Sequence, residues 1–328
     1  MANHSSSPSL LCASFNQDHS YFAVGTRDGV RIFDTNTGRL CYERAVGAFV
    51  IAEMLFSSSL LAIVGAGDQP SLSPRRLCLF NTTTGAALRE LNFLTSILAV
   101  RMNRQRLIVI LQDKAYVYEI NSLTILDTID TVPNIKGLCA FSPCLDACYL
   151  ALPASTTKGS ALLYNVMDCH LHCESYSFRR GTYPSTIFSL SFGPSKQLPD
   201  ILAASSSSGS IHLFTLGFAS HPSRSKRSSG FLGSIIPGAV NDVLDPAYHH
   251  VLHNAVSAGV KSHAIIRKVE NVTNSSSSEL LACRAIMSVI TYNGYFQEYN
   301  LSIDAQNELS WSLVREFNLL TATMDKAS

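Results

Sequence analysis

Short apolar runs rich in β-branched and aromatic residues recur along the whole chain. Glycine, asparagine, aspartate and serine separate these runs, and the 3.6-residue period of an amphipathic helix is almost absent. Runs of this length between turn residues are typical of β-strands. The pattern predicts an all-β fold with strands at YFAVG, VRIF, LLAIVG, RLCLF, RLIVIL, AYVYEI, ALLYNV, DILAAS, SIHLF and SVITY.

Two turns between these runs are near copies, FDTNTG at 33–38 and FNTTTG at 80–85, which indicates an internal repeat. One aromatic residue per repeat serves as a marker, and successive markers are 47, 38, 46, 50 and 85 residues apart. Four of these steps lie close to the period of about 40–50 residues of four-stranded propeller blades. We therefore expect a WD40-like β-propeller with six recognisable blades, although a two-sheet sandwich is an alternative. The six markers are Phe33, Phe80, Tyr118, Tyr164, Phe214 and Tyr299.

The step of 85 residues indicates an insertion between the last two markers, and not a missing set of strands. We predict a single propeller domain over residues 1–328, with an inserted loop at about 217–260. Its basic first part, followed by apolar residues between glycines, suits a membrane interface. The alternative is a loop whose apolar part folds back onto a blade. The cations are Arg224, Lys226 and Arg227, and the apolar residues are Phe231, Leu232, Ile235 and Ile236.

Composition narrows the possible functions. The formal net charge of +1 provides no global basic field, so we expect no nucleic-acid partner. The sequence has no run of about 18 apolar residues and no basic, apolar N-terminal signal, and nine scattered cysteines suit a reduced, cytoplasmic protein. No nucleophile, metalloprotease or phosphate-loop motif is present, so we predict neither catalysis nor a cofactor. The cluster CHLHC at 169–173 would alternate between two strand faces, which argues against a metal site.

Two adjacent arginines, Arg179 and Arg180, stand out in the stretch SYSFRRGTYP at 175–184. Arginine forks match phosphate oxygens, but neighbours on a strand point to opposite sides, which favours two separate anion sites. Gly181 permits a sharp turn after them and Thr182 offers a hydroxyl donor. The next strand pair, SSSSGSIHLF at 205–214, adds short donors at Ser206, Ser210 and His212. The alternative is a pair of solvated arginines in a loop.

At this point the chain resembles the PROPPIN (WIPI-type) propellers. Within that family it is most similar to the plant b-type members. The resemblance rests on FRRGTYPSTIFSLSF followed by ASSSSGSIHLF, and on FAVGTRDGVRIFD, VGAGDQPSLSPRRLCLFN and NIKGLCAFSP earlier in the chain. It implies binding of phosphatidylinositol 3-phosphate and 3,5-bisphosphate. It also implies a cytoplasmic scaffold recruited peripherally to preautophagosomal, endosomal or vacuolar membranes. A protein-binding scaffold with weakened lipid binding is the alternative.

The resemblance also assigns roles to residues. It implies that Arg179 serves one lipid site and that Arg180 serves another with Ser206, Ser210 and His212. The insertion takes the place of the family's membrane-inserting loop. The segment around Pro74, Arg75 and Arg76 corresponds to a region that contacts the lipid-transfer protein of autophagy.

One departure from the family changes these expectations. Family members have seven blades, whereas this chain passes from NVMDCHLHCE at 165–174 directly into FRRG. About one blade is absent, and the join lies within an outer strand. The partners of Arg179 would lie in that missing blade, so we expect only the site around Arg180 to be complete.

Overall fold

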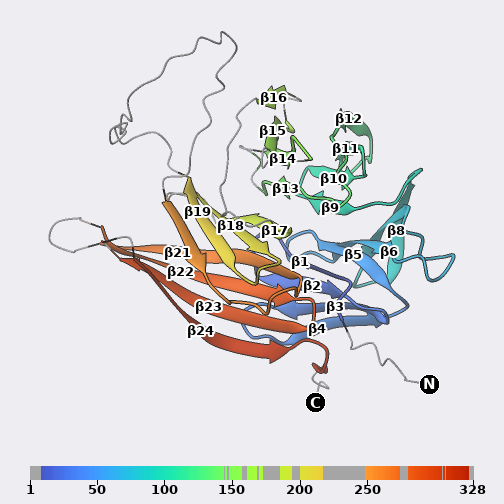
Figure 1. Cartoon of the computed structure of the whole chain (residues 1–328). Helices are drawn as coiled ribbons and strands as arrows, with labels where there is room; N and C mark the ends of the chain where they lie inside the picture. Colours follow the sequence, from blue (N-terminus) through green and yellow to red (C-terminus); the bar gives the residue numbers. More distant parts are fainter. Residues whose placement is uncertain are drawn as a thin grey trace, which may run out of the picture.

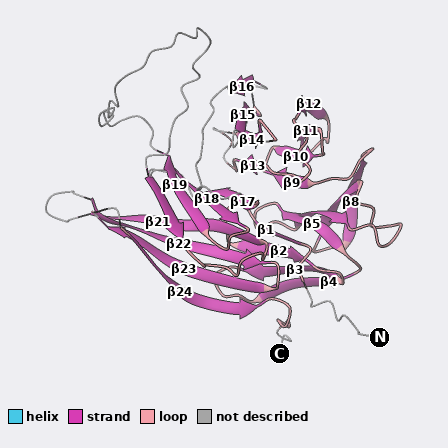
Figure 2. Ribbon diagram, viewed as in Figure 1, coloured by secondary structure: helices cyan, strands magenta, loops and turns pink. Residues whose placement is uncertain are grey.

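The computed structural model of the chain is a six-bladed β-propeller (Figure 1). It describes residues 9–143, 145, 148–156, 161–167, 170–172, 185–193, 200–216, 248–273, 280–304, 306 and 308–324. The described residues form six antiparallel sheets of four strands each, and no helix occurs among them (Figure 2). In every sheet the strands are ordered as they occur in the sequence.

The first three blades contain twelve strands: β1 (Cys12–Phe15), β2 (Tyr21–Gly25), β3 (Gly29–Asp34), β4 (Leu40–Ala45), β5 (Phe49–Met54), β6 (Leu60–Gly65), β7 (Arg76–Asn81), β8 (Ala86–Asn92), β9 (Ala99–Met102), β10 (Arg106–Ile110), β11 (Lys114–Glu119) and β12 (Ile125–Asp130). The last three contain β13 (Ala140–Phe141), β14 (Tyr149–Pro153), β15 (Ala161–Asn165), β16 (His170–His172), β17 (Ile187–Phe192), β18 (Asp200–Ser206), β19 (Ile211–Leu216), β20 (Tyr248–Leu252), β21 (Ser262–Thr273), β22 (Leu280–Thr291), β23 (Tyr295–Asp304) and β24 (Leu309–Asn318).

The six aromatic markers confirm the predicted repeat. Each lies in the third strand of a different blade, from Phe33 in β3 to Tyr299 in β23, and all six side chains are buried. A third strand has a neighbouring strand on both sides within its own sheet, and the faces of that sheet pack against the adjacent blades. A large apolar side chain is therefore favoured there. Between the last two markers, the described residues form β20, β21 and β22, which complete the fifth blade and begin the sixth.

The repeated FDTNTG and FNTTTG turns have a common hydrogen-bonding geometry. The Asp34 carboxylate accepts a hydrogen bond from the backbone N–H of Thr37 at 2.8 Å, and the Asn81 side-chain oxygen accepts one from Thr84 at 3.0 Å. Gly38 and Gly85 then take φ values of +75° and +70°, a region that glycine enters at little cost. The sequence motif therefore repeats because the same turn joins the third and fourth strands of two blades.

Ring stacking and hydrogen bonds between the first and last blades close the ring. No strand is exchanged between them, because each blade is continuous in sequence. Phe22 and Phe33 stack at a centroid distance of 5.1 Å, and Phe296 stacks on the other side of Phe22 at 5.2 Å. The Arg31 guanidinium donates to the carbonyl of Leu319 at 3.1 Å, and the backbone N–H of Leu10 donates to the Tyr292 carbonyl at 2.8 Å.

Two features lie around the predicted insertion and the predicted junction. Within the predicted insertion at about 217–260, Tyr248–Leu252 forms β20, the outer strand of the fifth blade. In this strand His250 lies opposite Leu213 of β19 and is buried. At the junction, His170–His172 forms β16, the outer strand of the fourth blade, which agrees with a join inside an outer strand.

Candidate anion-binding site

The predicted donors that the structure describes lie at one end of the fifth blade. Ser206 ends β18, Ser210 precedes β19, and His212 is the second residue of β19. Arg179, Arg180, Gly181 and Thr182 lie outside the described residues, as do all seven predicted residues of the membrane loop. The structure therefore brings together the serine and histidine half of the predicted site.

Hydrogen bonds within the serine-rich turn between β18 and β19 hold it in one conformation. The hydroxyls of Ser206 and Ser208 are 2.9 Å apart, and the backbone N–H of Gly209 donates to the Ser206 carbonyl at 3.0 Å. Ser206 is only 1% exposed, whereas Ser208 is exposed and Ser210 is half-buried. Ser206 thus orders the turn, while Ser208 and Ser210 keep contact with solvent.

The chain that follows the double arginine is anchored to this same turn. The Ser207 hydroxyl lies 2.9 Å from that of Ser185 and accepts the backbone N–H of Thr186 at 3.0 Å. The backbone N–H of Ser207 donates in return to the Thr186 carbonyl at 2.8 Å. Arg180 precedes Ser185 by five residues, and five residues span at most about 18 Å. The covalent chain therefore limits how far Arg180 can lie from the serine turn.

A stack of three rings adjoins the turn and includes a residue that the sequence did not reveal. His249 of β20 stacks on Phe214 at a centroid distance of 4.5 Å and on His212 at 5.1 Å. The His212 Nδ1 and His249 Nε2 atoms are 2.9 Å apart and share a hydrogen bond. The run YHHVL could have indicated β20, because its valine and aromatic residues favour a strand.

The environment of His249 favours its neutral form. Burial lowers the pKa of His249, and the neighbouring His250 lowers it further. A neutral imidazole has one donor and one acceptor nitrogen, so the pair can share one N–H and keep another donor. His212 is 4% exposed, and so its ring is held rigidly within the blade beside the turn. The arrangement offers fixed neutral donors, to which an arginine would add the charge that an anion requires.

Gly209 is necessary to the shape of the turn, and alanine substitution tests this. Gly209 and Gly259 both have φ of +80°, but a Cβ at Gly209 would lie 2.3 Å from the Val256 carbonyl oxygen, whereas one at Gly259 meets nothing within 4 Å. We expect Gly259→Ala to lower the free energy of unfolding by about 1 kcal/mol, and Gly209→Ala by a further ~1–3 kcal/mol. Equal losses in chemical denaturation would show that the turn yields to the added methyl group.

The predicted partner segment in the second blade belongs to the long connection between β6 and β7. Arg75 is exposed, and its carbonyl accepts the backbone N–H of Phe93 at 2.9 Å. Arg76 forms an ion pair with Glu90 at 3.4 Å, and the carbonyl of Pro74 accepts the N–H of Ile97 at 2.8 Å. A groove of about 290 Å³ between the first and second blades is lined in part by Arg76. The segment is ordered and leaves one arginine side chain in solvent.

Comparison with known proteins relates this architecture to a family. The family model of PROPPIN proteins matches residues 9–175. Autophagy-related protein 18b of Arabidopsis thaliana is 60% identical in an alignment that covers 98% of this chain and all of that protein. The alignment extends over 365 positions and this chain has 328 residues, so at least 37 positions fall against gaps in this chain. A deficit of that size is close to one blade.

Solved structures show the same fold. Hsv2 of Kluyveromyces lactis with a complete loop 6CD has a TM-score of 0.59 at 13% identity, covering 95% of this chain and all of the solved one. Atg21, solved in complex with the coiled coil of Atg16, has a TM-score of 0.55 at 19% identity, covering 95% of this chain and 99% of the solved one. At sequence identities of 13% and 19%, these structural similarities show the β-propeller fold alone.

Proposed function

Because the chain belongs to the PROPPIN family, we propose that it is a scaffold propeller of autophagy that binds membrane phosphoinositides through Arg180 and the serine turn. The role is one of binding and not of catalysis. The ligand would be a 3-phosphorylated inositol headgroup, whose phosphate matches an arginine fork and short hydroxyl donors.

The observation that carries this proposal is the set of three hydrogen bonds joining Ser207 to Ser185 and Thr186. Through them, the segment that follows the double arginine is attached to the turn that contains Ser208 and Ser210. His212 is held beside that turn by its hydrogen bond and by ring stacking. The cationic and neutral donors of one headgroup site would thus come from consecutive parts of the chain.

The rest of the membrane contact would come from the segment between β19 and β20. This segment, 217–247, separates the third and fourth strands of the fifth blade and contains the predicted membrane-loop residues. Hsv2 has a loop called 6CD, and a form with that loop replaced by a Gly-Ser linker has been solved. If one blade is missing before FRRG, the fifth blade here corresponds to a sixth blade, and the two loops correspond.

Protein partners would bind away from this edge. We propose the second-blade segment with Pro74, Arg75 and Arg76 for the lipid-transfer protein of autophagy, because Arg75 is exposed on an ordered loop. The complex of Atg21 with the Atg16 coiled coil is consistent with partner binding by a similar propeller.

Among the described residues, no helix has the length and apolar character to cross a bilayer. We therefore propose peripheral recruitment to autophagic, endosomal or vacuolar membranes.

Vesicle flotation with single arginine variants tests the lipid proposal. We expect Arg180→Thr to weaken binding to vesicles containing phosphatidylinositol 3-phosphate at least about tenfold, since a charge-assisted contact contributes ~1.5–3 kcal/mol. Arg39→Thr is a matched control, because Arg39 is exposed in the first blade far from the turn. Unchanged binding by Arg180→Thr would instead favour a propeller that acts only as a protein scaffold.

A further inference from the structure

The outer strand of the sixth blade differs from the other outer strands in length and charge. β24 has ten residues, whereas β4, β8, β12, β16 and β20 have three to seven. Charged residues occur within β4, β8 and β12, for example Glu43, Arg89 and Asp127. Charge and shortness are two means by which proteins prevent a sheet edge from pairing with another chain. Residues 309–314 of β24 carry no charge, so neither protection applies to this part of the strand.

The outer edge of β24 is available for pairing. The strand pairs with β23 on its inner side, and no strand of the described part of the chain lies on its outer side. Residues 310–314 are all exposed, and Trp311, Leu313 and Val314 are 38%, 49% and 54% exposed. The strands of this blade also reach beyond the neighbouring blades at their left ends in Figure 1. An exposed and uncharged edge of this kind can bind another extended segment through its backbone.

Trp311 identifies the apolar face at the start of this strand. It lies opposite Leu301, and its ring packs edge-on against that of Tyr299 at a centroid distance of 5.7 Å. Leu301 and Tyr299 are buried against the fifth blade. Alternate residues of a strand share a face, so Leu309 and Leu313 lie on the same face as Trp311. The apolar side chains thus form one row along the outermost strand.

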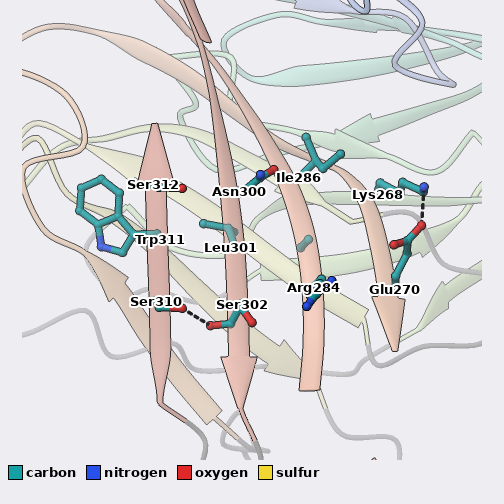
Figure 3. Close-up of a pocket in the computed structure, with 11 residues that line it drawn as sticks. Lys268, Glu270, Arg284, Ile286, Asn300, Leu301, Ser302, Ser310, Trp311 and Ser312 are labelled. Carbon is teal, nitrogen blue, oxygen red and sulfur yellow. Dashed lines mark hydrogen bonds and ion pairs between the residues drawn. The ribbon is translucent and has the colours of Figure 1, made fainter. Parts of the chain in front are cut away.

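Serine residues form the opposite face of the same segment. Ser310 lies opposite Ser302, and its hydroxyl donates to the Ser302 carbonyl at 3.3 Å (Figure 3). Ser312 lies opposite Asn300 on this face. A partner strand at this edge would therefore meet an apolar row on one face and short hydroxyls on the other.

The segment 309–313 reads LSWSL, which is the same in both directions. Two such segments paired antiparallel and centred on Trp311 place Leu309 of one copy opposite Leu313 of the other. Ser310 then lies opposite Ser312, so every residue meets one of its own type on the matching face. Aromatic pairs and hydrogen bonds between hydroxyls stabilise directly opposed positions. A register shifted by one residue would instead place leucine opposite serine, so the palindrome favours one register.

The residues that flank the palindrome are compatible with this register. The first charged residues on either side, Glu308 and Arg315, have opposite signs. Antiparallel pairing brings the acid of one copy toward the base of the other and places no like charges opposite each other. Val314 forms a β-bulge against β23, and a bulge ends regular pairing. The charges thus complement those of a second copy, and the contact is limited to the palindrome.

We propose that residues 309–313 are a self-association edge, at which β24 pairs antiparallel with β24 of a second copy of this chain. The contact is isologous and joins the two sixth blades into one sheet of eight strands. Five paired residues form an interface at the small end of the specific range, so we expect a weak dimer with a dissociation constant on the order of 10 µM. The inference goes beyond the proposed lipid function and does not depend on it.

Sedimentation velocity without lipid tests this proposal directly. We expect the mass to rise from that of one chain toward that of two chains from about tenfold below to about tenfold above that dissociation constant. The emission of Trp311, the only tryptophan of the chain, should move to shorter wavelength over the same range as its ring becomes covered. A chain that stays monomeric at the highest concentration would overturn the proposal and leave the edge to an extended segment of another protein.

Two matched double variants test the register. Ser310→Lys with Ser312→Lys places lysines opposite each other twice, and we expect the dimer to weaken at least about tenfold. Ser310→Lys with Ser312→Glu places an acid opposite a base twice, so its dimer should be at least as stable as that of the unchanged chain. Both variants change the same two exposed positions, and circular dichroism verifies that both are folded. Equal dissociation constants for the two variants would contradict pairing at this edge.

Discussion

Replacement of Phe22 by alanine is expected to lower the free energy of unfolding by about 3–5 kcal/mol. Phe22 is fully buried, and its ring lies between those of Phe33 and Phe296 at the interface of the first and last blades. Loss of this ring leaves a cavity at the one interface that must form between the two ends of the domain. Because domains are typically stable by only ~5–15 kcal/mol, much of the total would be lost.

Chemical denaturation followed by circular dichroism measures this loss. Leu94→Ala is a suitable control, since Leu94 is 93% exposed and its removal should change stability by no more than about 0.5 kcal/mol. A loss below about 1 kcal/mol for Phe22→Ala would mean that the Phe22–Phe296 contact contributes little. The ring would then depend mainly on the hydrogen bonds of Arg31 and Leu10.

Restoring the missing blade is expected to strengthen binding to phosphoinositide vesicles about a hundredfold. The restored chain would carry, before Phe178, the residues that the Arabidopsis relative has opposite the gaps in this chain. Two headgroup sites on one rigid body bind with avidity, which commonly exceeds single-site affinity by ~10²–10⁴. The physical reason is that the second headgroup binds without a new loss of translational freedom.

Substitution of Arg179 tests whether the stronger vesicle binding comes from a second headgroup site. Arg179→Thr should weaken vesicle binding in the restored chain and leave binding by the present chain nearly unchanged, because its predicted partners belong to the missing blade. Flotation of the four proteins at equal lipid concentration makes the comparison. Equal binding by the present and restored chains would show that a single site accounts for all the affinity.

Local sequence patterns were reliable guides to the blades. The markers Phe33 and Phe80 predicted one strand in each repeat, which the structure shows to be the third strand of its blade. Asp34 and Asn81 predicted the turns that follow, because both signals arise within a few residues. The position of β20 was missed, because its one local signal is the short run YHHVL, and the strand is completed by pairing with β19. That pairing also created the contact between His212 and His249, which no local pattern contains.

The sequence by itself determined the all-β class, the repeat and the number of blades, and it indicated candidate residues for anion binding. Alternation, turn residues and chain order act over short distances, and so they can be read directly. Only the tertiary structure decided which residues meet. It joined Phe22 to Phe296, and it attached Ser207 to the segment after the double arginine. These contacts depend on strand register and on the relative lengths of neighbouring blades, which are properties of the assembled ring.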